Sequence, residues 1–263
     1  MNIFKNLNEN DENDDESDTF LDNICDDQIY DEILNGDITE DEVSNAIKNL
    51  KNGKTAGIDD FVNEYFKCSS PQLVNIYCTL FNLVFNSGIV PETWLNGIIR
   101  SIYKNKGDAN DPDNYRAITL ISCSGKLFTS IINSRLTFLS NEFEIISRCQ
   151  FGFRKGYSTT DTIFIMHVLI SYFSFGKKLY CTFIDFRKAF DTVWRIGLWK
   201  KLQNYGIKGK CFRIIYNMYD NIKSCIMYNN ENSNFFSLYA RGAPRRKFIP
   251  FFFHFPKRSR RLF

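Results

Sequence analysis

The hydrophobic and polar positions along the chain predict a mixture of helices and short strands. Apolar residues recur at helical spacing after Thr39, and Thr39 followed by Glu42 is the sequence of a capping box. A second amphipathic helix is expected between Ser70 and Gly88. Its apolar face would consist of Leu73, Ile76, Tyr77, Leu80, Phe81 and Val84. Further helices are predicted at 126–139, 160–173, 198–205 and 211–219.

Shorter apolar runs predict strands. Residues 98–103 and 116–122 flank a polar segment rich in Gly, Asp and Pro, which is typical of a β-hairpin with a long tip. Residues 180–184 form a third apolar run, and 222–228 with 235–238 predict a second hairpin. The sequence therefore favours an α+β fold.

Charge divides the chain into three parts. Residues 1–42 contain 16 acids and one base, and 240–263 contain eight Lys or Arg and no acid. We expect an acidic, disordered leader at 1–37, a folded domain at 38–239, and a separate basic, Phe-rich tail at 240–263. The middle of the chain is basic and rich in aromatic residues, which is compatible with a nucleic-acid groove but also with a solvated charged face.

Several classes of protein are disfavoured by the composition. No apolar stretch reaches the roughly 20 residues that span a bilayer, and the N-terminus lacks the pattern of a secretory signal. The eight cysteines form no Cys-x-x-Cys pair, and there are two histidines, so we expect no zinc site and free thiols instead. These features favour a protein of the nucleus or cytoplasm that is not secreted and does not enter a membrane.

The segment CTFIDFRKAFDTVW, residues 181–194, is the strongest candidate for chemistry. It places Asp185 at the end of an apolar run, where a buried carboxylate needs a compensating cation or hydrogen-bond donors. Mg²⁺ binds carboxylate and phosphate oxygens and would compensate this charge. The alternative is that Asp185 only caps a turn. Asp191 is better interpreted as a helix N-cap than as a metal ligand.

FIDFRKAFDTVW resembles the first catalytic motif of reverse transcriptases from LINE-type (non-LTR) retrotransposons. Four other segments resemble landmarks of the same family, in the same order, between residues 38 and 239. The family usually has Pro at the position of Ala117. The four segments are KNLKNGKTAGIDD, IIRSIYKNKGDANDPDNYRAITLIS, SGKLF and QFGFRKGYSTTD.

The resemblance implies a right-hand polymerase, with fingers and part of the palm in this region. It also implies RNA template, DNA primer, dNTPs and two Mg²⁺ ions as partners in nucleotidyl transfer. Asp185 and the backbone carbonyl of Phe186 would bind metal. Phe190 would lie beneath the incoming sugar and exclude a 2′-hydroxyl, although an ordinary core position is the alternative.

Two further groups of residues are implied by the resemblance. The triphosphate would be held by Lys104, Lys106 and Arg116, which could otherwise be a solvated hairpin tip. The template and nucleotide would lie near Gln150, Gly152, Phe153 and Arg154.

The chain departs from the family after YARGAP. The family continues to a hairpin with an Asp-Asp pair, whereas here no acid follows Glu231. We expect a polymerase domain truncated before its second catalytic motif, and a change of reading frame near 240–245 would explain the tail. Because one aspartate cannot hold two metals, we expect little or no polymerase activity. The alternative functions are a salt-sensitive RNA- or DNA-binding remnant and an unstable pseudogene product.

Overall fold

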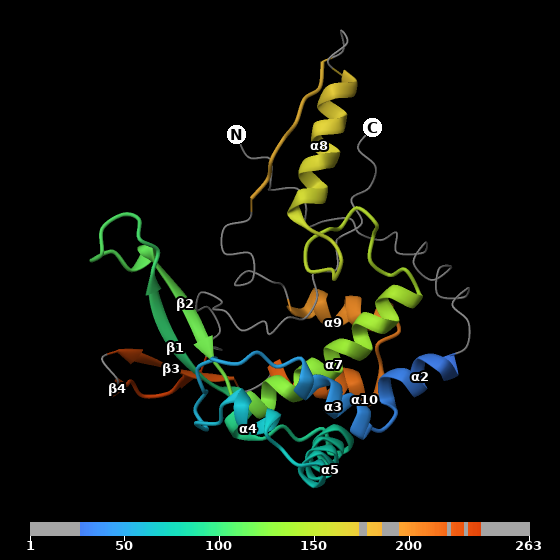
Figure 1. Ribbon diagram of the computed structural model, residues 1–263, viewed down its shortest axis with the longest axis vertical. Helices are drawn as coiled ribbons and strands as arrows, with labels where there is room; N and C mark the ends of the chain where they lie inside the picture. Colours follow the sequence, from blue (N-terminus) through green and yellow to red (C-terminus); the bar gives the residue numbers. More distant parts are fainter. Residues whose placement is uncertain (1–26, 174–177, 186–194, 220–221, 229–230, 238–263) are drawn as a thin grey trace.

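The computed structural model describes residues 27–173, 178–185, 195–219, 222–228 and 231–237, and it confirms the α+β class. Most helices form one body beside a small sheet, and α8 projects from this helical body (Figure 1). The helices are α2 (Asp27–Asn35), α3 (Glu40–Lys48), α4 (Asn63–Lys67), α5 (Pro71–Ser87), α6 (Glu92–Leu95), α7 (Cys123–Glu142), α8 (Thr159–Phe173), α9 (Arg195–Asn204) and α10 (Gly209–Tyr219). The strands are β1 (Asn96–Tyr103), β2 (Tyr115–Leu120), β3 (Lys223–Tyr228), β4 (Glu231–Asn232) and β5 (Phe236–Ser237), with a 3-10 turn at Pro112–Asn114.

The hydrophobic core lies where α3, α5, α7 and α10 meet. Phe81 and Phe85 of α5, Phe128 of α7 and Ile214 of α10 have no exposed surface, and the rings of Phe81 and Phe128 are 5.6 Å apart. Each such side chain contributes roughly 1.5–3 kcal/mol relative to an exposed position. The core therefore joins helices that are distant in the sequence.

The capping box predicted for α3 is confirmed. The Thr39 hydroxyl accepts a hydrogen bond from the Glu42 N–H at 3.2 Å, and the Glu42 carboxylate accepts one from the Thr39 N–H at 2.9 Å. The same carboxylate is bound at 2.7 and 2.8 Å by the guanidinium of Arg135, from α7. Arg135 also donates to the carbonyl oxygens of Gly36 and Asp37, so one side chain fixes the α2–α3 connection on α7.

Helix α5 has the predicted bounds but buries a different face. It ends before Gly88, whose φ of 74° is the left-handed conformation that glycine adopts readily. Phe81 and Val84 are buried as predicted and Tyr77 is half-buried. The predicted face was wrong for Leu73, Ile76 and Leu80, which are exposed, while Cys78 and Phe85 are buried. The helix is apolar on more than one side, so spacing alone did not determine which side packs.

The sheet has the order β2-β1-β3-β4, with β5 also paired to β3. The first predicted hairpin is confirmed, because β1 and β2 are antiparallel from Ile98 opposite Leu120 to Tyr103 opposite Tyr115. The second is confirmed for its described residues, since β4 and β5 run antiparallel to β3. Strand β3 lies parallel to β1, so the two hairpins share one sheet.

The expected strand at 180–184 was wrong. This segment is not part of the sheet, and Tyr180 and Phe183 are each 85% exposed. An apolar run indicates burial, but a strand also needs a pairing partner, and no described strand pairs with it. The segment extends beside α8 in Figure 1, and α8 itself buries no residue.

Part of the expected leader is folded. Residues 27–35 form α2, whose Leu34 is 1% exposed and belongs to the core. The acidic composition concealed this helix, because acids such as Asp31 and Glu32, both exposed, are typical of a solvated segment. Residues 1–26 of the leader and the whole tail at 240–263 lie outside the described residues.

Candidate nucleic-acid and nucleotide interface

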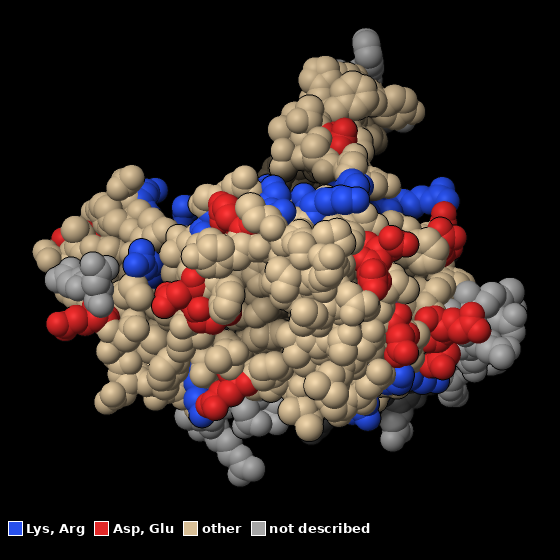
Figure 2. Space-filling model, turned by 60° about the horizontal axis from the view of Figure 1, so that its bottom comes forward, with Lys and Arg blue, Asp and Glu red and all other residues tan. Residues whose placement is uncertain are grey.

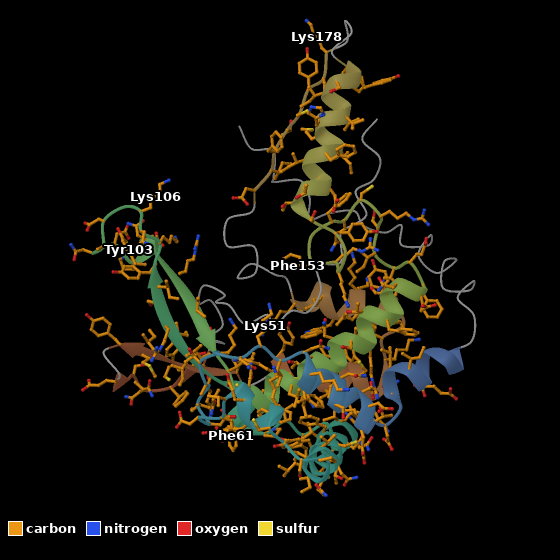
Figure 3. All side chains as sticks on the ribbon, viewed as in Figure 1. Lys51, Phe61, Tyr103, Lys106, Phe153 and Lys178 are labelled. Carbon is orange, nitrogen blue, oxygen red and sulfur yellow. The ribbon has the colours of Figure 1, made fainter. Side chains whose placement is uncertain are left out.

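The tip of the β1–β2 hairpin is organised by its own side chains. The Lys104 ammonium donates to the Asp113 carbonyl at 2.5 Å, and the Tyr103 hydroxyl donates to the Gly107 carbonyl. The rings of Tyr103 and Tyr115 lie 5.3 Å apart across the ladder. Lys106 lies at the exposed end of this tip (Figure 3). Of the two predicted lysines, Lys104 is therefore engaged by the hairpin backbone and Lys106 extends into solvent.

Arg116 lies on the arm of the hairpin. It pairs with Ile102 in the ladder, and Arg100 pairs with Ile118. Because opposed residues and every second residue share a face, Arg116 and Arg100 project on the same side of the sheet. The Arg100 guanidinium contacts the Met227 sulfur at 2.9 and 3.1 Å, which fixes it toward β3. This face presents two exposed arginines.

Residues 147–157 form a compact loop between α7 and α8, hereafter the 147–157 loop. The Gln150 N–H and the Arg154 guanidinium both donate to the Ser147 carbonyl, at 3.0 and 3.2 Å. The Arg154 guanidinium lies 4.4 Å from the Tyr157 ring centroid. The structure thus brings the predicted residues Gln150, Gly152, Phe153 and Arg154 together in one loop.

Asp185 is the last described residue of the exposed 178–185 segment. Its side chain is exposed rather than enclosed, so burial does not force it to have a cation. Phe186 and Phe190, expected beside the metal and the sugar, lie outside the described residues.

Within the described ranges, no group of three or more His, Cys, Asp or Glu side chains could hold a metal ion. Asp185 supplies one carboxylate there, whereas a site for two magnesium ions needs several. The described residues therefore do not make up the magnesium site that the resemblance implies.

A contact that the sequence did not predict joins the 51–62 segment to the start of α7. The Ser122 hydroxyl lies 2.5 Å from the Asp59 carboxylate and accepts a hydrogen bond from the Gly125 N–H, so it both caps α7 and binds the segment. A Cβ on Gly57 would lie 2.4 Å from the backbone of Ile121. The polar residues of this contact lie in the sequence segments GIDD and ISCSG, but nothing in the sequence indicated that the two segments meet.

The same segment presents basic residues to solvent. Lys51 and Lys54 are exposed, and Lys51 is labelled in Figure 3. The Gly53 N–H donates to Glu64 at 2.6 Å, and this hydrogen bond lowers the pKa of the Glu64 carboxyl below its usual range. In Figure 2, Lys and Arg side chains form a band across the body next to the projecting helix.

Comparison with known proteins identifies a family model and several similar proteins. A family model for reverse transcriptase (RNA-dependent DNA polymerase) matches residues 102–244. The probable RNA-directed DNA polymerase from transposon BS of Drosophila melanogaster is 33% identical over 170 residues, 63% of this chain and 18% of that protein. The probable RNA-directed DNA polymerase from transposon X-element of Drosophila melanogaster is 32% identical over 166 residues, which are 62% of this chain and 18% of that protein.

The RNA-directed DNA polymerase from mobile element jockey of Drosophila melanogaster is 30% identical over 165 residues, 61% of this chain and 18% of that protein. The matched part of the chain thus spans about a fifth of the length of these relatives. Among the described helices, none is both long and apolar enough to cross a membrane.

Proposed function

This chain belongs to the reverse transcriptase family of non-LTR, LINE-type retrotransposons, and on that basis we propose that it forms the fingers and part of the palm of an RNA-directed DNA polymerase. The observation that carries the proposal is the family match across 102–244, which contains the hairpin arm, the 147–157 loop and Asp185. We assign residues 38–239 to this domain. RNA template, DNA primer and dNTPs are its proposed partners.

The β1–β2 hairpin supplies the proposed triphosphate contacts. Arg116 presents a planar guanidinium, which binds phosphate oxygens in bidentate fashion, and Lys106 provides a second exposed cation at the tip. Lys104 donates to the Asp113 carbonyl, so we assign it the role of shaping the tip around Lys106. Phe190 is proposed to exclude ribonucleotides by contact with the sugar.

We propose that Asp185 contributes one ligand, with the Phe186 carbonyl, to a magnesium site whose other ligands lie outside the described residues. Magnesium would stabilise the charge that develops on phosphate oxygens during nucleotidyl transfer. Because the sequence has no Asp-Asp pair after Glu231 to complete a site for two ions, the chain by itself is proposed to have little or no polymerase activity.

Binding to an RNA–DNA hybrid tests the interface. We expect the logarithm of the association constant to fall linearly with the logarithm of salt concentration. Binding of a dNTP to the complex of protein and hybrid tests the hairpin. Arg116→Ala and Lys106→Ala should each weaken dNTP binding by about 10-fold, because a charge-assisted hydrogen bond contributes about 1.5–3 kcal/mol. Lys48→Ala, an exposed lysine in the last turn of α3, serves as the matched control and should leave the dNTP affinity unchanged. Equal dNTP affinities in all four proteins would refute the assignment of the hairpin.

Primer extension separates catalysis from binding. Hybrid binding without dNTP incorporation would favour the second candidate function, a non-catalytic nucleic-acid-binding remnant. This candidate is supported by the absence of a carboxylate cluster among the described residues. Templated incorporation that Asp185→Ala abolishes would contradict the proposed inactivity and support the role of Asp185.

A further inference from the structure

Helix α5 carries a second apolar side that the core does not use. Its core side is buried through Phe81, Val84 and Phe85. A separate set of large apolar side chains on the same helix is exposed by 39–66%. This set, hereafter the α5 stripe, consists of Leu73, Ile76, Leu80 and Leu83.

The α5 stripe has the spacing of a seam between paired helices. Its members follow one another at intervals of three, four and three residues. Apolar side chains with this alternation lie along one side of a helix and insert between the side chains of a neighbouring helix. Single exposed apolar residues are common on proteins, whereas a contiguous row of them marks an interaction surface. The stripe therefore fits another helix.

The polar side of α5 already has partners. The Asn82 side chain exchanges hydrogen bonds with the backbone of Ile38 at 2.7 and 2.8 Å. The Asn75 side chain donates to the Glu40 carboxylate at 2.6 Å. At 3.6 residues per turn, the α5 stripe lies between this polar side and the core side. The stripe is thus the side of the helix that remains in contact with water.

Charge indicates which partner suits the stripe. The 17 residues of α5 include no Asp, Glu, Lys or Arg. Figure 2, in which the lower side of Figure 1 comes forward, shows a broad area without charged side chains. A nucleic acid would require cations here, and a strongly charged protein would require an opposite charge. Two copies of this neutral stripe can meet without repulsion and without burying a charge.

We propose that the α5 stripe pairs with the α5 stripe of a second copy of this chain in a two-fold dimer. The patch must then be self-complementary, and a straight row of regularly spaced apolar side chains meets this condition. The segment before α4 would extend the contact: the Phe66 ring lies 5.3 Å from the Tyr77 ring of α5, and the exposed Phe61 ring lies 6.4 Å from Phe66 (Figure 3). The patch is small beside the roughly 20–30 residues a side of a standard interface, so we expect a weak, reversible dimer.

This pairing would leave the proposed nucleic-acid surface open. Figure 1 shows α5 on the opposite side of the helical body from α8 and from the 147–157 loop. The inference therefore adds an interface to the proposed function and does not depend on it.

Sedimentation-velocity centrifugation of the full chain over about 1–200 μM tests the pairing. We expect the weight-average sedimentation coefficient to rise with concentration from the value of a monomer toward that of a dimer. Leu83→Glu places a charge in the stripe and should weaken association at least about 10-fold. Ile163→Glu on α8 is the matched control and should leave association unchanged, because Ile163 is 68% exposed and Leu83 is 66% exposed.

A charge swap tests whether the two stripes face each other. One protein carries Ile76→Glu with Leu83→Glu, a second carries Ile76→Lys with Leu83→Lys, and each alone should be monomeric. Mixed in equal amounts, they should form a heterodimer, because opposite charges then meet across the seam. Circular dichroism should show the same helix content in all variants, which separates loss of pairing from loss of folding.

The outcomes separate this inference from the proposed function. The pairing is overturned if the unmodified protein stays monomeric throughout the range, if Ile163→Glu weakens association as much as Leu83→Glu, or if the swapped variants do not associate when mixed. Each of these results leaves the polymerase assignment standing, because binding to the hybrid is measured separately. A protein that dimerises as expected but does not bind the hybrid would refute the proposed function and leave the pairing intact.

Discussion

We predict that Arg135→Met destabilises the protein far more than Arg148→Met. Both arginines bind a glutamate at 2.7 Å, but the side chain of Arg135 is 8% exposed and that of Arg148 is 82% exposed. Removing Arg135 leaves the half-buried Glu42 carboxylate without its cation and removes the hydrogen bonds that the guanidinium donates to three carbonyl oxygens, those of Leu34, Gly36 and Asp37. Breaking a buried pair in this way costs about 3–5 kcal/mol, whereas the exposed pair is screened by solvent and its loss should change the free energy of unfolding very little.

The free energy of unfolding is measured by urea titration with circular dichroism. Adding Glu42→Gln to Arg135→Met should recover part of the loss, because it removes the uncompensated charge. Burial raises the pKa of Glu42, but hydrogen bonds from Arg135 and the Thr39 N–H overcome this effect and lower it below the glutamate range. The stabilisation is therefore complete above about pH 4.3 and is lost as pH falls through the lowered pKa. Equal losses for Arg135→Met and Arg148→Met would refute the reasoning.

Two further predictions concern packing and thiol reactivity. Gly57→Ala should lower the free energy of unfolding by about 1–3 kcal/mol, because its Cβ would lie 2.4 Å from the Ile121 backbone. Gly152→Ala is the control and should change the free energy of unfolding by less than about 0.5 kcal/mol, because a Cβ there would meet no atom within 4 Å. Equal losses in the two variants would contradict the tight contact at Gly57. Burial raises the pKa of the Cys211 thiol to about 12. Alkylation at about pH 8, read by mass spectrometry, should therefore label the exposed Cys68 and Cys149 and leave Cys211 unmodified until the protein unfolds. Equally rapid labelling of Cys211 in the native protein would contradict its burial.

Local features of the fold were predictable from sequence. The capping box at Thr39 and Glu42 needs residues three positions apart, and the first hairpin needs two short runs with a polar tip between them. The predicted ends of α5, marked in the sequence by Pro71 and Gly88, were also correct. Each of these features depends on contacts between chain neighbours, which spacing and turn chemistry report directly.

Features that depend on distant partners were missed. The parallel pairing of β1 with β3 joins segments that no local pattern connects. Asp59 and Ser122 meet across 63 residues, so neither position showed that it belonged to a contact. The 180–184 run has the composition of a buried strand, but composition cannot supply the neighbouring strand that would pair with it.

The residues of the candidate site remain predictions from the resemblance. Gln150, Gly152, Phe153 and Arg154 are close in sequence, and the structure places them in one loop. The engagement of Lys104 by the Asp113 carbonyl could not be predicted, because it depends on the path of the hairpin tip. The left-handed backbone of Phe153, whose φ is 63°, is also invisible in the sequence, where a Phe after Gly152 has no distinguishing feature.

The pairing of β1 with β3 has a consequence during translation. Arg100 and Met227 are 127 residues apart, and at about 5–20 residues per second the ribosome needs roughly 6–25 seconds to deliver the second strand after the first. Throughout this interval the nascent β1–β2 ribbon keeps an open hydrogen-bonding edge, which other chains can occupy. The step most exposed to misassembly is therefore the wait of β1 for a partner that has not yet been made.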